Sequence, residues 1–327
     1  MRRLWIGSLA AAGILLAYGI GFDSARRTDA STSGSLREQD APPASSVSSV
    51  KLRTERQSPT DLEIGGELRR VPRGASRYLT REDLLTLPQV TYTVTDDPNF
   101  TGPTEISGVP LEELTRALGA VPQEEMVVAI CDDKYRANYP HDYVAAHHPL
   151  LVLTINGQPP SGWPKDSGGH GDDMGPYLVS HPAFTPSFKI FSHADEPQIP
   201  WGVVRIELRK QNAVFGAIAP RGNRAAAARV EAGYRIARQN CFRCHNMGRE
   251  GGQKSGISWW VLSKRAVTSS RYFADYVRDP RAKNPVAQMP ANSGYDDRTI
   301  EALTAYFQTF PPPDAASILI PPQKGKP

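Results

Sequence analysis

An uncharged, apolar run opens the chain, covering residues 4–22 after a short basic start. In a helix this run would extend about 28 Å, close to the roughly 30 Å thickness of a bilayer core. Trp5 and Tyr18 lie near its two ends, where interfacial aromatic side chains are favoured. The pattern predicts an N-terminal hydrophobic helix that acts as an uncleaved signal anchor over residues 1–23. A cleaved signal peptide is the alternative, and both interpretations place the following residues outside the cytoplasm.

Polar residues dominate the next segment, residues 24–77, which is rich in Ser, Pro, Arg and Thr. A segment of this kind buries too little apolar surface to offset the entropy that is lost on ordering. The sequence therefore predicts a disordered linker over these residues.

Alternating apolar and polar positions begin near Tyr78, and a period of two is typical of β-strands. Pro110 stands where proline is tolerated at a helix start, which predicts a helix that ends at Leu118. A second short helix is expected at residues 141–147. The architecture expected for residues 78–215 is a β-rich α+β domain, with strands at residues 90–95, 104–109, 126–131, 150–155, 177–180, 189–191 and 203–208.

Helical spacing replaces the strand pattern after residue 222. Leu303, Tyr306 and Phe307 fall on one face of the last helix, which three consecutive prolines end. The sequence thus predicts two domains, of which the second is all-α over residues 222–311, and a proline-rich tail at residues 312–327. Its helices are expected at residues 225–240, 272–278 and 297–310.

Composition agrees with two domains of ordinary size, since the chain has 327 residues of which 39% are hydrophobic. The formal net charge of +4 is mild, and no basic stripe typical of nucleic-acid binding is present. The chain has three cysteines, and two of them, Cys241 and Cys244, belong to one motif. Cys131 alone cannot form an internal disulfide, so no disulfide framework is expected.

The motif Cys241-Phe242-Arg243-Cys244-His245 has the spacing C-x-x-C-H, which is typical of covalent attachment of c-type haem. The two thiols add to the two vinyl groups of the porphyrin, and the adjacent imidazole becomes the proximal iron ligand. A zinc half-site would need a second ligand pair, and a thiol redox pair would not need His245. The motif therefore predicts one covalent haem c held by Cys241 and Cys244, with His245 on the iron.

Two further positions match a known family. Gly233 lies eight residues before Cys241, and Met289 is followed by Pro290. With the motif, these residues make about 223–310 resemble class I cytochromes c. The resemblance implies that the first and last helices cross closely at Gly233, against Leu303 and Tyr306. It also implies that Met289 is the sixth iron ligand, because Met-Pro is the distal motif of that family. His/Met ligation raises the reduction potential relative to two histidines, as suits one-electron transfer.

The net charge of the second domain indicates what kind of redox partner it would attract. Residues 221–310 contain 15 Lys and Arg against 7 Asp and Glu, a net charge of +8. A basic face would steer an acidic redox partner protein towards the haem; a generally basic, solvated surface is the alternative. Bacterial haem attachment to C-x-x-C-H takes place outside the cytoplasm. The motif and the apolar start therefore agree on the periplasmic side, with residues 4–22 as an anchor in the inner membrane.

Turn and strand segments of the first domain carry a second resemblance. The segments are Gly108-Val109-Pro110-Leu111, Leu150-Leu151-Val152-Leu153 with Asn156-Gly157-Gln158-Pro159, Gly175-Pro176-Tyr177-Leu178, and Trp201-Gly202-Val203-Val204-Arg205-Ile206. In this order, over roughly residues 78–210, they resemble the molybdopterin-binding domain of the sulfite oxidase family. That family ligates molybdenum through a cysteine ahead of the first turn, and residues 91–106 contain none. Cys131 lies on a later strand, as a small buried residue. The domain is therefore expected to keep the fold and to lack molybdenum.

Three functions stay open on this basis. The first is one-electron transfer by an exported c-type cytochrome that has no substrate of its own. The second is a haem-coupled molybdenum oxidoreductase, similar to a sulfite dehydrogenase, which needs bound molybdopterin. The third is a non-catalytic docking subunit of a membrane respiratory complex. Arg136 also has two interpretations, because it either lines a pocket of the first domain or forms a structural salt bridge.

Overall fold

The computed structural model describes residues 50–68, 71–72, 74–119, 125–165, 173–182, 197–223, 225 and 227–310. All of them fall in one compact unit, Ser46–Pro327. Three predicted segments lie outside the described residues: the apolar helix at 4–22, the strand at 189–191 and the tail at 312–327. Within the described ranges, no helix is long and apolar enough to cross a membrane.

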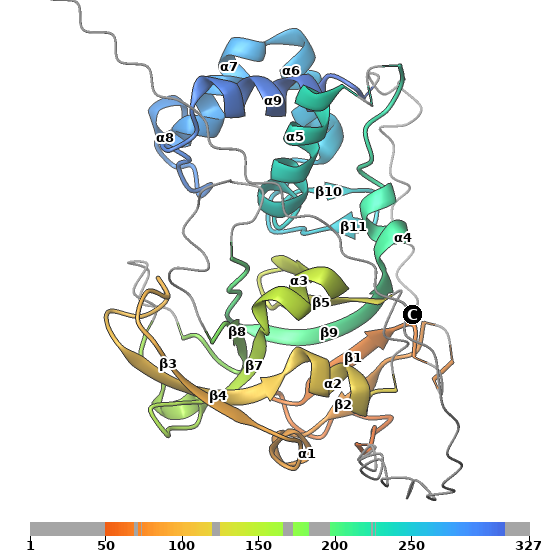
Figure 1. Ribbon diagram of the computed structural model, residues 1–327, viewed down its shortest axis with the longest axis vertical. Helices are drawn as coiled ribbons and strands as arrows, with labels where there is room; N and C mark the ends of the chain where they lie inside the picture. The colour runs from red at the N-terminus through yellow and green to blue at the C-terminus, as the bar shows by residue number, and fades with distance from the viewer. Residues whose placement is uncertain are drawn as a thin grey trace, which may run out of the picture. The chain divides into compact units, whose positions relative to one another are not determined.

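A five-stranded sheet is the centre of the β-rich domain, which comprises the described residues from 50 to 218 (Figure 1). β1 and β9 are parallel, and the other neighbours are antiparallel. β1 lies inside the segment predicted to be a disordered linker, so that prediction is wrong there. Leu62 and Ile64 of β1 are fully buried, and this burial offsets the ordering entropy. The strand order is β2 (Arg77–Leu79), β1 (Leu62–Gly66), β9 (Val203–Lys210), β5 (Glu125–Cys131) and β6 (Arg136–Tyr139).

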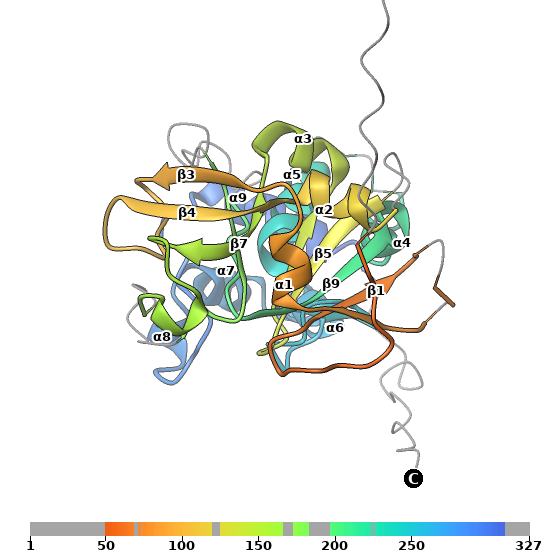
Figure 2. The ribbon, with the colours of Figure 1, turned by 90° about the horizontal axis from the view of Figure 1, so that it is seen from below.

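A four-stranded antiparallel sheet completes the β-rich domain, and Figure 2 shows β3, β4 and β7 running side by side. Its strand order is β3 (Val90–Val94), β4 (Thr104–Pro110), β7 (Leu150–Ile155) and β8 (Leu178–Ser180). The predicted β-rich α+β class is confirmed for these residues. The helices of the domain are α1 (Arg81–Leu85), α2 (Leu111–Ala117), α3 (His141–His147) and α4 (Gln211–Gly216), with a 3₁₀ turn at Pro160–Gly162.

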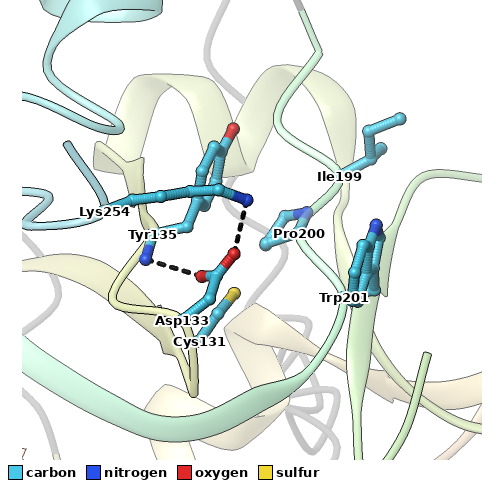
Figure 3. A pocket seen from close by; sticks show the side chains of 7 residues that line it. All are labelled: Cys131, Asp133, Tyr135, Ile199, Pro200, Trp201 and Lys254. Carbon is cyan, nitrogen blue, oxygen red and sulfur yellow. Dashed lines mark hydrogen bonds and ion pairs between the residues drawn. The ribbon is translucent and has the colours of Figure 1, made fainter. Parts of the chain in front are cut away.

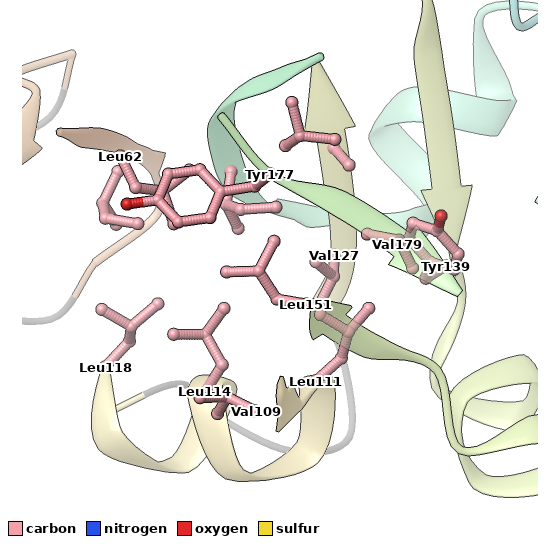
Figure 4. Packing of buried hydrophobic residues seen from close by; sticks show 14 of the residues in the cluster. Leu62, Val109, Leu111, Leu114, Leu118, Val127, Tyr139, Leu151, Tyr177 and Val179 are labelled. Atoms are coloured by element: carbon pink, nitrogen blue, oxygen red, sulfur yellow. The ribbon is translucent and has the colours of Figure 1, made fainter. Parts of the chain in front are cut away.

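The core of the β-rich domain lies where the two sheets meet α2. Leu111 and Leu114 of α2 pack with Leu151 of β7, Val127 of β5 and Tyr177, and all five side chains are buried (Figure 4). The 3.6-residue period of α2 and the two-residue period of the strands bring these side chains to one interior. The apolar positions that predicted the elements are thus the ones that hold them together.

The helical domain, residues 228–310, follows the β-rich domain. The predicted helices at 225–240, 272–278 and 297–310 correspond to α5, α7 and α9. The sequence did not predict α6, α8 or the short hairpin of β10 and β11. In chain order the elements are α5 (Ala228–Ile236) with a π-helical turn (Ala237–Cys241), β10 (Asn246–Met247), β11 (Glu250–Gly251), α6 (Trp259–Thr268), α7 (Ser270–Arg278), α8 (Pro280–Lys283) and α9 (Asp297–Phe307).

The crossing of α5 and α9 depends on Gly233. A Cβ atom at Gly233 would lie 2.0 Å from the carbonyl oxygen of Ala302 and 2.7 Å from Cβ of Tyr306. Only a residue without a side chain allows the two helices to approach this closely. Leu303 and Tyr306 are fully buried beside the crossing. The expected meeting of Gly233 with this face of α9 is therefore observed in the structure.

Alternate side chains of β5 are buried in two different hydrophobic clusters. Val127 and Ala129 belong to the core of the β-rich domain. Met126 and Val128 belong to a second cluster, which also contains Phe242 of the C-x-x-C-H motif and the buried side chains of the helical domain. An apolar interface of this kind favours a fixed arrangement of two domains over independent motion. The motif is thus packed directly against the five-stranded sheet.

Candidate functional site

The C-x-x-C-H motif forms a single tight turn. Cys241 ends the π-helical turn that continues α5. The backbone N–H of Cys244 and that of His245 both donate to the carbonyl oxygen of Cys241, at 3.2 and 3.0 Å. Helical spacing places Cys241 and Cys244 on one face, and both side chains are half-buried. The two thiols and the imidazole therefore belong to side chains of a single turn, as the motif predicts.

The imidazole of His245 is oriented by a backbone carbonyl. Its Nδ1 donates to the carbonyl oxygen of Ile257 at 2.6 Å, and the residue is only 8% exposed. This bond fixes the tautomer, so that Nε2 carries the lone pair that a metal needs. Burial lowers the pKa of His245, and the hydrogen bond to Ile257 opposes that shift. The neutral form that ligates metals is thereby favoured.

Two glycines allow the chain after His245 to fold back onto the motif. A Cβ atom at Gly252 would lie 1.7 Å from the carbonyl oxygen of Arg243, and Gly251 has a φ of +88°. The N–H of Gly252 donates to Phe242 O at 2.9 Å. This support was not predicted from the sequence, although the Gly-Gly pair seven residues after Cys244 was a visible signal.

Met289 lies in the loop between α8 and α9 and is half-buried. Asn292 anchors this loop to the end of α7, since its N–H donates to Arg278 O and its Nδ2 to Val277 O, each at 2.9 Å. Cys241, Cys244 and His245 are brought together in one turn, whereas Met289 belongs to a separate loop. Its role as sixth iron ligand stays a prediction.

The residues present fit a covalently bound haem. The donor set consists of two thiols three positions apart and a neutral imidazole whose Nδ1 already has an acceptor. Aromatic side chains pack behind the motif: the ring centroids of Phe242 and Trp259 are 5.4 Å apart, and those of Trp259 and Phe307 are 4.9 Å apart. Fully buried rings of this kind exclude water from the protein side of the site.

Comparison with protein families agrees with this geometry. Residues 228–307 match the family described as cytochrome C oxidase, cbb3-type, subunit III. Residues 228–307 form a cytochrome c-type domain. The match covers α5 to α9 and includes the C-x-x-C-H turn and Met289. A cytochrome c-type domain implies haem c and supports electron transfer by haem.

Solved structures also include chains that are similar to this one. The chain is 18% identical to a chain of the sulfane dehydrogenase SoxCD from Paracoccus pantotrophus, with a TM-score of 0.31. The similarity covers 48% of this chain and 40% of that chain, so this chain spans less than half of its length. The curated proteins gave no match.

A cavity of about 150 Å³ lies between the β-rich domain and the cytochrome c-type domain (Figure 3). Its lining includes Cys131, Tyr135 and Trp201 from the β-rich domain and Lys254 from the cytochrome c-type domain. The Lys254 ammonium forms an ion pair with Asp133. The other lining residues are Asp133, Ile199 and Pro200.

Cys131 has the properties of a buried strand residue. It is 4% exposed, and burial, with Asp133 and Asp132 nearby, raises the pKa of its thiol well above the usual value. A thiol that ligates a metal is normally held as a thiolate by a lowered pKa. Within the described ranges, no group of three or more His, Cys, Asp and Glu side chains is placed to hold a metal ion.

Arg136 forms structural ion pairs. Of the two interpretations of this residue, pocket lining or a structural salt bridge, the second is therefore observed. Its guanidinium lies 3.0 Å from a carboxylate oxygen of Glu207 and 3.5 Å from one of Glu250. Glu207 belongs to β9, which β5 separates from β6 in the sheet, whereas Glu250 belongs to β11 of the cytochrome c-type domain. Arg136 therefore connects the five-stranded sheet to the loop that follows His245.

Proposed function

We propose that this protein is an exported c-type cytochrome that passes single electrons through one covalent haem. Cys241 and Cys244 form the thioether bonds, and His245 and Met289 are the axial ligands. The observation that carries the proposal is the His245 Nδ1 hydrogen bond to Ile257 O within a C-x-x-C-H turn of a cytochrome c-type domain. This bond prepares Nε2 for iron in advance.

The chain's own residues have three tasks in this function. The C-x-x-C-H turn holds the group covalently at a fixed position. The Ile257 carbonyl holds the His245 ring in one orientation. The buried rings of Phe242, Trp259 and Phe307 keep water from the protein side of the site. When bound, haem supplies an iron that alternates between the ferric and ferrous states.

Expression with a cytochrome c maturation system tests this proposal. The wild-type chain should carry one haem that survives denaturing electrophoresis and acid extraction. Cys241→Ala or Cys244→Ala should weaken or abolish that attachment, whereas Cys131→Ser should retain it. Loss of the wild-type haem stain on simple acid extraction would rule out covalent attachment.

The partner and location belong to the same proposal. The net charge of +8 over residues 221–310 favours an acidic redox partner protein. Residues 4–22 are proposed to anchor the chain to the periplasmic face of the inner membrane. If so, the rate of haem oxidation by the partner should fall with rising ionic strength, and the protein should fractionate with membranes and resist salt extraction.

The β-rich domain is proposed to bind no molybdenum. The support is the missing cysteine between Thr91 and Ile106 and the burial of Cys131 within the core of the β-rich domain. Elemental analysis of protein from a host that makes the pterin cofactor is the test, with iron as the internal standard. Stoichiometric molybdenum that is lost in Cys131→Ser would establish instead a haem-coupled molybdenum enzyme.

A further inference from the structure

We propose that Arg136 of the β-rich domain is a positioning residue for the proximal haem ligand His245. It holds the segment of residues 249–251, and the continuation of that segment presents the Ile257 carbonyl to the imidazole. The inference rests on the proposed function, because it assigns His245 to the iron. It goes beyond that function by giving the β-rich domain a part in setting the haem's properties.

Arg136 stands at the contact between the two domains. It begins β6, the edge strand of the five-stranded sheet, and is 8% exposed. Its backbone N–H donates to the carbonyl oxygen of Arg243, inside the C-x-x-C-H motif, at 2.9 Å. The N–H of Gln253 donates in turn to Lys134 O at 3.0 Å. The turn between β5 and β6 is thus bonded to the motif and to the loop that follows it.

The side chain of Arg136 adds a second set of bonds. Nη1 lies 3.3 Å from Arg249 O and 3.4 Å from Gly251 O, the two carbonyls on either side of Glu250. Nη2 donates to Glu207 on the sheet at 3.0 Å. Charge-assisted hydrogen bonds of a planar guanidinium are strong and directional, and a lysine has no second in-plane donor with which to replace them. The Arg136 guanidinium therefore fixes the β11 segment relative to the sheet.

Further bonds hold the chain that continues from that segment to the imidazole. Ser255 N donates to Cys244 O at 3.0 Å, and Ile257 N to Ser255 Oγ at 3.1 Å. The Ile257 carbonyl then accepts the His245 Nδ1 proton at 2.6 Å. A hydrogen bond to the second nitrogen of a ligating histidine sets its orientation and its basicity. A more basic imidazole stabilises ferric iron, so weakening this bond raises the reduction potential.

The main test is Arg136→Lys, which keeps the positive charge and replaces the two guanidinium nitrogens Nη1 and Nη2 by a single ammonium. We expect the Nδ1 proton of His245 to exchange with solvent faster than in the wild type, as measured by NMR of ¹⁵N-histidine-labelled protein. We also expect the haem midpoint potential to rise. Arg136→Ala should accelerate the exchange further, so that lysine gives partial rescue. Unchanged exchange and potential in Arg136→Lys would overturn the positioning role.

Arg205→Ala is the matched control. Arg205 lies on the same sheet and pairs with Glu63 and Glu207, but it makes none of the bonds to the loop. It should change the stability and leave both readouts at their wild-type values. If the same shifts appeared in Arg205→Ala, a general effect of the charge network would explain them, and the positioning role would be refuted.

Two further measurements keep the outcome decisive. If neither Arg136 variant folds, Glu250→Gln loosens the same contact from the loop side, and unchanged readouts there would count against the proposal. The wild-type haem stain tests the proposed function alone. Both readouts are measured on the haem-loaded protein. A wild type that carries covalent haem, with exchange and potential unchanged in Arg136→Lys, would therefore refute the positioning role and leave the proposed function intact.

Discussion

Replacing Gly233 by alanine tests the close crossing of α5 and α9 in the cytochrome c-type domain. The added Cβ would lie 2.0 Å from the Ala302 carbonyl oxygen, whereas a carbon–oxygen contact normally needs about 3.3 Å. α5 and α9 would have to separate by about 1.3 Å at this point. Backbone atoms cannot rotate away, so the strain has to be distributed over the interface that buries Leu303 and Tyr306.

The magnitude follows from two opposing effects. Overpacking of a closed interface costs about 1–3 kcal/mol and sometimes more, and a rigid backbone neighbour places Gly233→Ala at the upper end. Alanine gains about 1 kcal/mol over glycine in a helix interior. The expected net loss in the free energy of unfolding is therefore about 2 kcal/mol.

Urea denaturation, followed by haem absorbance and by tryptophan fluorescence, measures this loss. Gly216→Ala is the control, because a Cβ at that exposed position of α4 meets no atom within 4 Å. It should be neutral or slightly stabilising. A Gly233→Ala protein as stable as the wild type would show that the two helices do not depend on this close approach.

Three further outcomes follow from the site and the core. Met289→Ala should remove the sulfur-to-iron charge-transfer band of the oxidised protein and lower its potential; an unchanged band would identify another ligand. Gly252→Ala should reduce the yield of attached haem, while Gly256→Ala, which meets no atom within 4 Å, should not. Burial lowers the pKa of His181 from 6.5 to about 3. The unfolded chain therefore takes up a proton below pH 6.5 that the fold does not. Stability should fall by about 2 kcal/mol between pH 7 and 5, and His181→Gln should remove this slope in urea titrations.

The sequence predicted those features that depend on residues close to one another along the chain. The C-x-x-C-H turn and the apolar face of α9 are encoded in spacings of a few residues, whereas the glycine at the helix crossing was implied by the family resemblance. β1 was not predicted because Leu62 and Ile64 are its only large apolar residues, within a polar stretch. Their burial depends on pairing with β9, more than a hundred residues later. The bonds of Arg136 to Arg249 and Gly251 are equally remote along the chain, at separations of 113 and 115 residues.

The double role of β5 has a consequence for anyone who wishes to isolate the haem-bearing segment. Met126 and Val128 fill the same interior as Phe242, so a fragment that began at α5 would leave part of this interior uncovered. Its exposed apolar surface would favour aggregation. A transplantable unit would have to include the β5–β6 hairpin, which means that the boundary of the autonomous folding module does not coincide with the boundary of the sequence family.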